Sequence, residues 1–205
     1  GAAIVHRYNS IIEQTSMFDT ISCNLISGGA VGVGDDMLNR TAALVLHGAK
    51  IICIDVAHGH HILVKNALTK LRKRFGNDIH IMAGNVATLE GFNDLADWGA
   101  DSIRCNIGGG SICTTRIQAG HGVPGLETIF QCAKSDRDAK IIADGGIKNS
   151  GDIVKAFAAG ADAVMLGSLL AGTDCSPGTI FKTETGELRK TYRGMASAAA
   201  QRDWR

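Results

Sequence analysis

Short apolar runs alternate along the chain with segments in which apolar residues recur every three or four positions. The runs are rich in β-branched residues and nearly continuous in apolarity, as expected for parallel strands buried on both faces. They end chiefly in Gly, Asp, Asn or Ser, which predicts polar groups gathered at one edge of a sheet. The predicted strands are 2–7, 30–34, 50–56, 79–85, 101–107, 140–147 and 162–168.

Three of the intervening segments have the periodicity of amphipathic helices, with apolar residues near i, i+3, i+4 and i+7. They are 63–75, 125–134 and 151–161. Ser150 is expected to cap the last of these helices, and Gly160 lies near its end. The basic cluster at 70–74 is expected to complement the carboxyl end of the first helix and to face water.

Repeated strand–helix units imply right-handed parallel crossovers, and therefore either a (β/α)₈ barrel or a doubly wound open sheet. Seven predicted strands and the lack of GxGxxG after the first favour the barrel. A complete barrel normally needs about 250 residues, and this chain has 205. We therefore predict an α/β TIM barrel that lacks its first βα unit, with 1–205 forming a single truncated catalytic domain.

Composition narrows the class of protein further. Apolar residues make up 45% of the chain, no apolar run is long enough to cross a bilayer, and no signal-peptide pattern opens the sequence. A net charge of +1 gives no reason to expect nucleic-acid binding. Six scattered cysteines without a CxxC pair favour reduced thiols in a cytoplasmic protein. His58, His60 and His61 lack recognisable partners for a zinc site, so we expect loop or surface histidines.

The stretch GGGSICTTR at 108–116 is the most informative for chemistry. Its glycines let the backbone approach a ligand closely, so that turned carbonyls can hold a cation and N–H groups with Ser111 can hold a phosphate. Cys113, flanked by two threonines and near Arg116, is a candidate activated thiolate. The alternative is a glycine-rich turn with an inert buried cysteine, and these residues alone leave both open.

Two later strand ends carry a second candidate site. Asp144, Gly145 and Gly146 follow one predicted strand, and Gly167–Ser168 follows the next. Late strands of a phosphate-binding barrel commonly supply N–H donors, with a short helix aimed at the phosphate. Asp144 can accept hydrogen bonds from ribose hydroxyls, or alternatively cap a helix.

GGGSICTTR, ADGGI, MLGSLLAG and YRGMAS, in this order and spacing, resemble the family of inosine monophosphate (IMP) dehydrogenase and guanosine monophosphate (GMP) reductase. DVAHGH followed by MAGNVAT, and HRYNSIIEQ near the start, extend the resemblance across nearly the whole chain. It implies that Cys113 attacks C2 of the purine, that a hydride passes to NAD, and that the covalent thioimidate is hydrolysed to xanthosine monophosphate (XMP).

The resemblance also implies a role for each matching residue. Thr115 would assist proton transfer beside Cys113, and the protein would be a homotetramer. Potassium would bind the carbonyls of Gly108, Gly110 and Cys113. The dinucleotide would contact Asp55, Asn85, Arg104, Asn106 and Gly108. The nucleotide substrate would contact Ser111, Asp144, Gly145, Gly146, Gly167, Ser168, Tyr192, Gly194, Met195 and Ala196.

The chain departs from the family pattern at three places. Asn106 stands where the family usually has Gly, which is expected to alter cofactor contacts. No Arg-Tyr pair of the dehydrogenase flap is present at the end of the chain, and neither Arg202 nor Arg205 can be matched to it. The regulatory insertion common in dehydrogenases is absent between the second and third predicted strands.

Three functions remain open at this point, and NAD-dependent oxidation of IMP leads. The alternative is a reductase that converts GMP to IMP with NADPH, which the missing insertion favours. Ala198 stands where the reductase pattern has Glu, which favours the dehydrogenase. The sequence YRG at 192–194 is also closer to the dehydrogenase pattern than to that of the reductases. A non-catalytic nucleotide-binding barrel is the third function, and the joint presence of Cys113, Thr115 and Asp144 argues against it.

Overall fold

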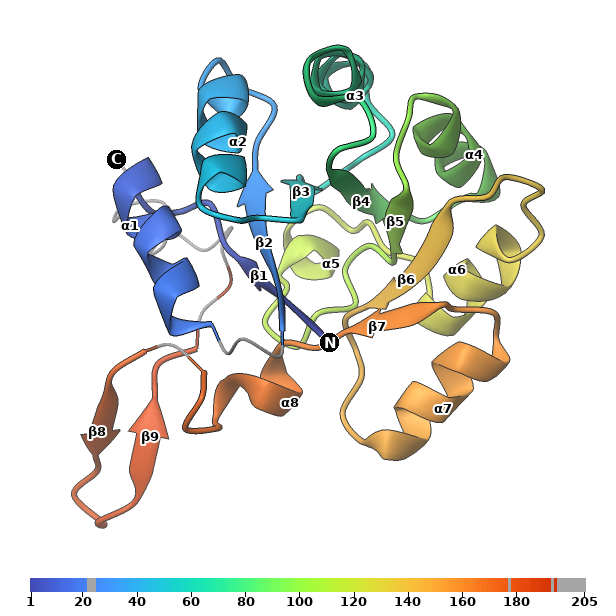
Figure 1. The fold of residues 1–205 in the computed structure, drawn as a ribbon. Coiled ribbons are helices and arrows are strands. Elements are labelled where there is room, and N and C mark those ends of the chain that lie inside the picture. The colour runs from blue at the N-terminus through green and yellow to red at the C-terminus, as the bar shows by residue number, and fades with distance from the viewer. Residues whose placement is uncertain (22–24, 177, 193, 195–205) are drawn as a thin grey trace.

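A computed structural model of the chain describes residues 1–21, 25–176, 178–192 and 194. Among these residues, seven parallel strands form one curled sheet in which each strand pairs with its neighbours in sequence (Figure 1). The strands are β1 (Ala2–Val5), β2 (Ile26–Val31), β3 (Ile51–Asp55), β4 (His80–Val86), β5 (Ser102–Cys105), β6 (Lys140–Asp144) and β7 (Ala163–Met165). This is the arrangement of an incomplete TIM barrel, as the alternating pattern predicts; the absence of a first βα unit stays a prediction.

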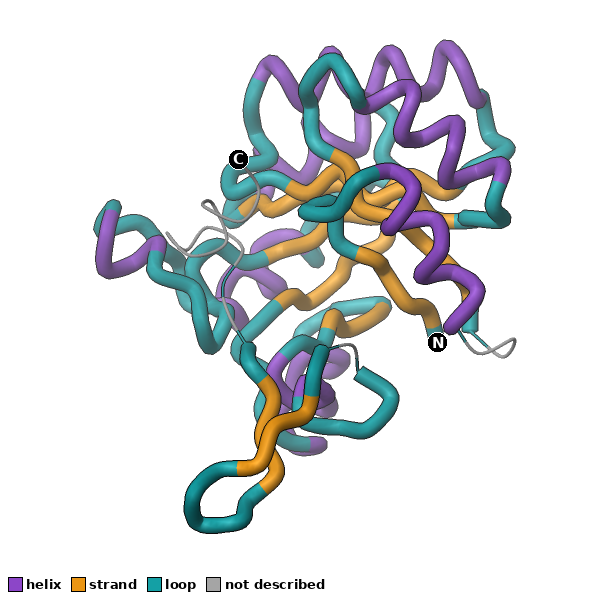
Figure 2. Tube along the Cα trace, turned by 90° about the vertical axis from the view of Figure 1, so that its left-hand side faces the viewer, coloured by secondary structure: helices purple, strands orange, loops and turns teal. Residues whose placement is uncertain are grey.

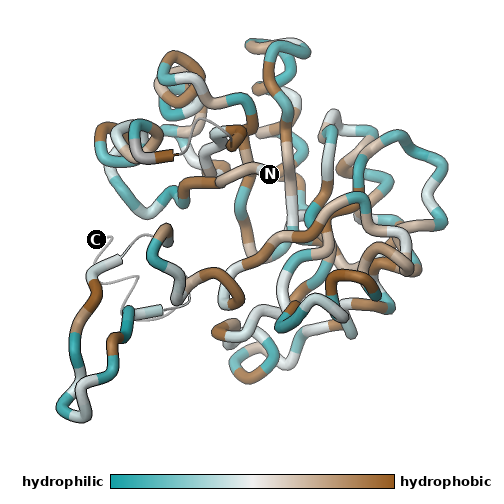
Figure 3. Tube along the Cα trace, turned by 60° about the horizontal axis from the view of Figure 1, so that its bottom comes forward, coloured by the Kyte–Doolittle hydropathy of each residue, from teal (hydrophilic) through white to brown (hydrophobic). Residues whose placement is uncertain are grey.

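Helices cover the outer face of the sheet (Figure 1). They are α1 (Ile11–Ser16), α2 (Met37–Leu46), α3 (Ile62–Phe75), α4 (Leu89–Asp97), α6 (Gly125–Cys132) and α7 (Ser150–Ala158), with a 3-10 turn η1 at Met17–Thr20. The short helices α5 (Thr115–Gln118) and α8 (Ser168–Ala171) follow β5 and β7. Apolar and polar residues alternate along the outer helices (Figure 3), because one side of each helix packs on the sheet.

Two apolar clusters fill the two faces of the sheet. The larger lies between strands and helices and includes Ile52 and Ile54 of β3. The smaller includes Cys53 of the same strand with Ala30, Met82 and Ile142, from β2, β4 and β6. Successive side chains of a strand point to opposite faces, so these alternate residues fill the interior of the curled sheet and leave its rims for polar groups.

The second strand is the one strand whose predicted position needs correction. β2 runs over Ile26–Val31, so the predicted 30–34 starts too late. Gly28 and Gly29 look like a turn in the sequence, but they lie within this strand. Neighbouring side chains occupy the space where a larger residue at either position would place its own side chain. A Cβ at Gly28 would lie 2.5 Å from Cδ1 of Ile4, and one at Gly29 would lie 2.7 Å from Cδ1 of Leu44.

The three predicted helices are confirmed as α3, α6 and α7, with two corrections of detail. The residue that caps α7 is Asn149, whose side chain accepts from the backbone N–H of Asp152 at 3.0 Å; Ser150 is the first helical residue. Asn149 has the extended backbone typical of an N-cap.

The second correction concerns Arg72 in the basic end of α3. Lys70 and Lys73 are exposed, as expected, but Arg72 turns inward. It donates to the carbonyls of Gly99 and Gly76 at 2.7 and 2.8 Å, and its Nη2 lies 2.5 Å from Oδ2 of Asp101. These contacts join the end of α3 to the amino-terminal rim of the sheet.

The residues after β7 form a part of the fold that the strand–helix pattern does not predict. β8 (Ile180–Lys182) and β9 (Leu188–Lys190) pair as an antiparallel hairpin that extends away from the barrel (Figure 2). Lys190 anchors its base by donating to the carbonyls of Thr173 and Ser176, both at 2.7 Å. Of the helices in the described part of the chain, none is long and apolar enough to cross a membrane.

Candidate active site

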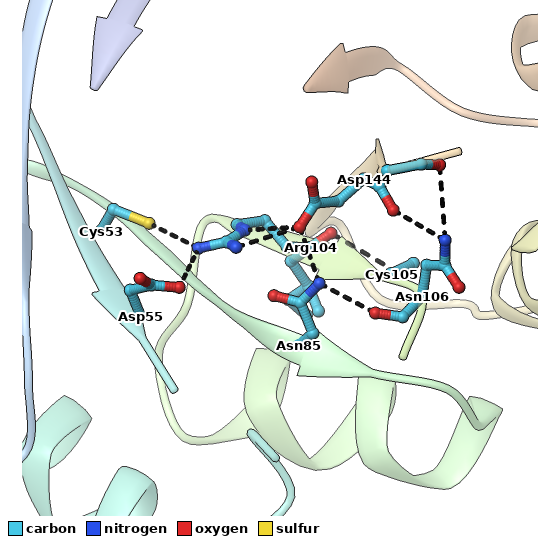
Figure 4. A network of polar contacts seen from close by, with 9 residues as sticks. Cys53, Asp55, Asn85, Arg104, Cys105, Asn106 and Asp144 are labelled. Carbon is cyan, nitrogen blue, oxygen red and sulfur yellow. Dashed lines mark hydrogen bonds and ion pairs between the residues drawn. The ribbon is translucent and has the colours of Figure 1, made fainter. Parts of the chain in front are cut away.

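Four predicted site residues meet at the carboxyl-terminal rim of the sheet. Asp55 ends β3, Asn85 lies near the end of β4, Arg104 lies in β5 and Asp144 ends β6. Figure 4 shows their side chains pointing toward one another. Active sites of TIM barrels lie at this rim, so the strand ends bring together the residues that the sequence selects.

Arg104 is the centre of this group. Its Nη1 lies 2.7 Å from Oδ1 of Asp55, and its Nε and Nη2 lie 3.1 and 3.0 Å from Oδ2 of Asp144. Burial opposes the charge of Arg104, but the attraction of the carboxylates of Asp144 and Asp55 and the hydrogen bond to Asp55 outweigh it and raise the pKa well above the ordinary value. The guanidinium is therefore charged throughout the physiological range and holds both carboxylates in place.

Cys53 lies beneath the group, in the interior of the sheet. Its Sγ accepts from Nη1 of Arg104 at 3.3 Å. Burial raises the pKa of the Cys53 thiol, and the charge of Arg104 only partly offsets this effect. Cys53 is therefore a neutral packing residue.

Asn85 connects Asp144 to the end of β5. Its Nδ2 donates to Oδ2 of Asp144 at 2.7 Å and to the carbonyl of Asn106 at 2.8 Å. Its Oδ1 is buried and has no hydrogen-bond partner among the described residues.

Gly59 is not among the predicted site residues, but it contacts this group. Its backbone N–H donates to the carbonyl of Asn85 at 2.7 Å. The glycine between two histidines in AHGH is the feature of the sequence that could have indicated it.

Asn106 has a backbone conformation that favours glycine. Its φ is +126°, and it is the only residue other than glycine with positive φ among those described. This conformation explains why the family pattern has Gly at this position. The Asn106 side chain donates from Nδ2 to the carbonyl of Asp144 at 2.8 Å, so its described contacts are with the protein backbone.

Cys113 lies exposed on the segment 108–116, which we call the nucleophile loop. Its Sγ lies 3.2 Å from Oγ1 of Thr115, the first residue of α5, and its backbone N–H donates to the carbonyl of Gly110 at 3.0 Å. An exposed thiol beside a hydroxyl suits a nucleophile better than an inert core cysteine. The structure therefore contradicts the burial that the inert alternative assumes, and the role of Cys113 as a nucleophile stays a prediction.

Arg116 is anchored within its own connection. Its Nη2 donates to the carbonyl of Val123 at 3.0 Å. Its side chain fills the space beside two glycines, since a Cβ at Gly108 or at Gly122 would lie 2.7 or 2.6 Å from it. Arg116 lies three residues after Cys113 in the sequence, but no hydrogen bond between its guanidinium and the Cys113 thiol is among the described contacts.

The nucleophile loop packs backbone to backbone against residues 144–146, which we call the nucleotide loop. Gly145 and Gly146 have φ of +81° and +79°. A Cβ at Gly145 would lie 3.0 Å from the backbone nitrogen of Gly110, and one at Gly146 would lie 3.3 Å from the carbonyl oxygen of Gly109. Glycines at these positions allow the Cys113 loop to lie directly beside the Asp144 strand end.

The remaining predicted substrate contacts approach the same region. Ser111 is exposed on the nucleophile loop, Gly167 is the N-cap of α8, and Ser168 is the first residue of that helix. A Cβ at Gly167 would lie 2.7 Å from Oη of Tyr192, and one at Gly194 would lie 2.9 Å from the carbonyl oxygen of Ile112. Met195 and Ala196, like Ala198, Arg202 and Arg205, lie outside the described residues.

The histidines after β3 have structural contacts. Nε2 of His60 lies 2.8 Å from Oδ2 of Asp94 on α4, and Nδ1 of His61 accepts from the backbone N–H of Leu63 and caps α3. Within the described part of the chain, no group of three or more His, Cys, Asp or Glu side chains is arranged to hold a metal ion.

Known proteins with similar sequences match most of the chain, including the candidate site. The chain is 51% identical over 175 residues to inosine-5′-monophosphate dehydrogenase of Aquifex aeolicus, a match that covers 84% of this chain and 35% of that protein. This chain spans only 35% to 41% of the length of the dehydrogenases of A. aeolicus, Rhizobium tropici and Bacillus subtilis that it matches.

Two solved structures are similar in fold and sequence. That of inosine 5′-monophosphate dehydrogenase from Legionella pneumophila superposes with a TM-score of 0.86 at 47% identity, covering 97% of this chain and 60% of that one. That of a GMP reductase variant from Trypanosoma brucei with guanosine 5′-monophosphate gives 0.84 at 43% identity, covering 88% and 38%. The IMP dehydrogenase / GMP reductase domain matches residues 1–205, and the chain belongs to this family.

Proposed function

We propose that the protein containing this chain oxidises IMP to XMP with NAD, through a covalent bond between C2 of the purine and the sulfur of Cys113. The arrangement of the two loops carries the proposal. An exposed cysteine, 3.2 Å from the hydroxyl of Thr115, lies on a loop that packs against the strand end bearing Asp144. This arrangement suits a nucleophile that must meet a ribose-bound base.

The nucleotide substrate has a consistent set of groups to bind it. Asp144 accepts from the ribose hydroxyls, while Arg104 and Asn85 orient its carboxylate through Oδ2. The phosphate is held by Gly145 and by the group Ser111, Gly146, Gly167, Ser168 and Tyr192. We assign the base edge to Gly194, Met195 and Ala196, of which only Gly194 is among the described residues. A Cβ at Gly194 would lie 2.9 Å from the carbonyl oxygen of Ile112, the residue before Cys113.

The chain's own residues divide the reaction between them. The sulfur of Cys113 forms a bond to C2 as the C2=N3 double bond opens, and the proton that the thiol loses passes by way of the Thr115 hydroxyl to N3. NAD, when bound, supplies the oxidation by accepting a hydride from C2. Water then adds to C2, the bond between C2 and the Cys113 sulfur breaks, and XMP leaves with the thiol restored. Proton transfer by a positioned group such as Thr115 contributes roughly 10²–10⁴-fold.

The rim of the sheet fits a dinucleotide beside the purine. Oδ1 of Asn85 is a buried acceptor without a partner among the described residues, and an amide N–H of a ligand would satisfy it. Asp55, Asn106 and Gly108 are the other residues we assign to this subsite. Arg104 contributes by holding Asp55 and Asp144, because its guanidinium is already engaged with both.

The nucleophile loop fits a potassium ion. The carbonyls of Gly108, Gly110 and Cys113 would hold the ion, and Gly108 has the positive φ, +81°, of a turned backbone. The carbonyl of Gly110 accepts from the backbone N–H of Cys113, and its second lone pair remains for a cation. The ion would stabilise the loop that carries the nucleophile.

Reduction of GMP to IMP with NADPH is the second candidate. The T. brucei GMP reductase structure, at 43% identity, supports it no better than the L. pneumophila IMP dehydrogenase structure, at 47% identity, supports the first. The presence of Ala198 in place of the glutamate of the reductase pattern argues for the dehydrogenase.

We further propose that the whole protein is a homotetramer. A stable, active monomer in light scattering of the whole protein would contradict this assembly.

The test uses the whole protein with IMP and NAD, and in parallel with GMP and NADPH. We expect turnover with the first pair and a nucleotide adduct on Cys113 in mass spectrometry. Cys113→Ala should abolish both, while Cys175→Ala, which changes an exposed cysteine outside the site, should change neither. Efficient turnover with GMP and NADPH would replace the dehydrogenase by the reductase, and an adduct on another cysteine would remove Cys113 from the mechanism.

A further inference from the structure

The carboxamide of Asn106 is enclosed between two glycines. A Cβ at Gly109 would overlap Nδ2 of Asn106, and a Cβ at Gly125, the first residue of α6, would lie 2.9 Å from the same nitrogen. Asn106 is 6% exposed. Its side chain therefore fills the space between the nucleophile loop and the start of α6, and only residues without a side chain fit on either side.

Hydrogen bonds hold Asn106 in this place despite its unfavourable backbone conformation. Nδ2 donates to the carbonyl of Asp144 at 2.8 Å and, at a longer 3.4 Å, to that of Gly145. The backbone N–H of Asn106 donates to Val86 at 2.9 Å, and its carbonyl accepts from Asn85. A non-glycine residue at positive φ persists where the surroundings over-determine it, and these four contacts do so.

We infer that Asn106 is a positioning residue that fixes the nucleophile loop relative to the nucleotide loop. The inference rests on the proposed function, because it assigns to Asn106 control over the distance between Cys113 and the bound nucleotide. Asn106 lies two positions before Gly108, the first residue of the nucleophile loop, and its side-chain amide donates to the carbonyl of Asp144, the residue that we propose binds ribose. A shift of about 1 Å between reacting groups costs roughly 10²-fold in rate.

The same geometry couples Asn106 to Gly109. The φ of Gly109 lies outside the region that disfavours side chains, so alanine meets no backbone penalty there. The obstacle is the Asn106 amide, which cannot move without breaking its bond to Asp144. A cavity of about 360 Å³ lined by Asn106, Gly109 and residues of α6 and α7 leaves room for the displaced side chain. Gly109→Ala should therefore fold and yet release Asn106.

A double-mutant cycle on the whole protein tests this coupling. The variants are Gly109→Ala, Asn106→Gly and the double variant, with kcat and KM for IMP and hydrogen exchange of the 107–113 amides as readouts. We expect Gly109→Ala alone to lower kcat about 10-fold or more, to change KM little and to speed exchange. In the Asn106→Gly background, the same change should cost about 2-fold or less.

Two further variants separate positioning from general loss of stability. Asn66→Gly makes the same replacement on the exposed face of α3, far from the two loops, and should leave kcat and loop exchange unchanged. Asn106→Asp keeps the size of the side chain but removes the Nδ2 donor, and should lower kcat with little change in KM.

Equal effects of Gly109→Ala in both backgrounds, in kcat and in exchange, would overturn the inference. An Asn106→Asp variant with the kcat of the unmodified protein would overturn it as well. If the unmodified protein does not turn over IMP with NAD, the proposed function fails instead. Hydrogen exchange still tests the coupling in that case, because it needs no turnover.

Discussion

Arg104 and Asp144 meet through a single carboxylate oxygen: Nε and Nη2 of the arginine lie 3.1 and 3.0 Å from Oδ2. Asn85 donates to the same oxygen at 2.7 Å. All the side-chain donors described for this carboxylate therefore converge on Oδ2, which leaves Oδ1 to accept from a ligand. The carboxylate is oriented by the protein alone, so binding of the proposed nucleotide would not have to order it.

Arg104→Lys should weaken nucleotide binding. Lysine keeps the charge, but one ammonium cannot reproduce the planar fork that contacts Asp55 and Asp144 together. Loss of one charge-assisted hydrogen bond predicts roughly a 10-fold rise in KM for IMP. Steady-state kinetics of the whole protein provide the measurement. Arg189→Lys, on the exposed hairpin, is the matched control and should behave like the unmodified protein; an unchanged KM in Arg104→Lys would contradict the role of the fork.

Thr115→Val should slow the reaction, because the Thr115 hydroxyl is 3.2 Å from the Cys113 sulfur and valine has the same shape without a proton to exchange. We expect kcat to fall roughly 10²-fold with a smaller change in KM. Thr114→Val changes the neighbouring exposed threonine, which caps α5 without a side-chain hydrogen bond, and should have little effect. Similar losses in both variants would mean that the loop, not the hydroxyl, is the sensitive feature.

Activity should depend on the monovalent cation in the buffer. The proposed ligands are backbone carbonyls of the nucleophile loop, whose spacing suits an ion of one size better than another. We expect the rate in potassium to exceed greatly the rates in lithium and in tetramethylammonium at equal ionic strength. Equal rates in the three salts would exclude a bound cation from the mechanism.

The start of α1 should make stability depend on pH. The backbone N–H and the hydroxyl of Ser10 donate to Glu13 at 2.9 and 2.8 Å, and they lower the pKa of that carboxyl from its ordinary 4.5. A lowered pKa in the folded state contributes stability above pH 4.5, which is lost as the pH falls through the folded value. Denaturation midpoints of the unmodified protein and Glu13→Gln should therefore differ most near pH 7 and converge below pH 4.5. Parallel pH curves would show that the capping box does not titrate as described.

The strands and three of the outer helices, α3, α6 and α7, follow from apolar periodicity, because buried strands and amphipathic helices need it to form a core. The other outer helices, α1, α2 and α4, are not among the predicted elements. Local composition gives a wrong prediction where a residue has to be small because neighbouring side chains occupy the space around it. Gly28 and Gly29 resemble a turn, and only the positions of Ile4 and Leu44 show why they lie within β2. The Ser10–Glu13 capping box is a signal that the sequence does contain, and it marks the start of α1.

The candidate site is predictable as a set of residues but not as a set of contacts. Polar residues at the ends of parallel strands must meet at one rim, so the proximity of Asp55, Arg104 and Asp144 follows from the fold class. That Arg104 serves both carboxylates depends on distances between strands that no local pattern encodes. The enclosure of Asn106 by Gly109 and Gly125 is likewise visible only once the chain is folded.

Arg72 joins the end of α3 to Gly99 and Asp101 at the rim of the sheet opposite Cys113 and Asp144. In TIM barrels this rim serves stability, while the other serves chemistry. Substitutions around Arg72 should therefore change the stability of the fold without altering the groups proposed to react. Engineering for thermal tolerance can accordingly begin at this rim, where a stabilising change does not compete with catalysis.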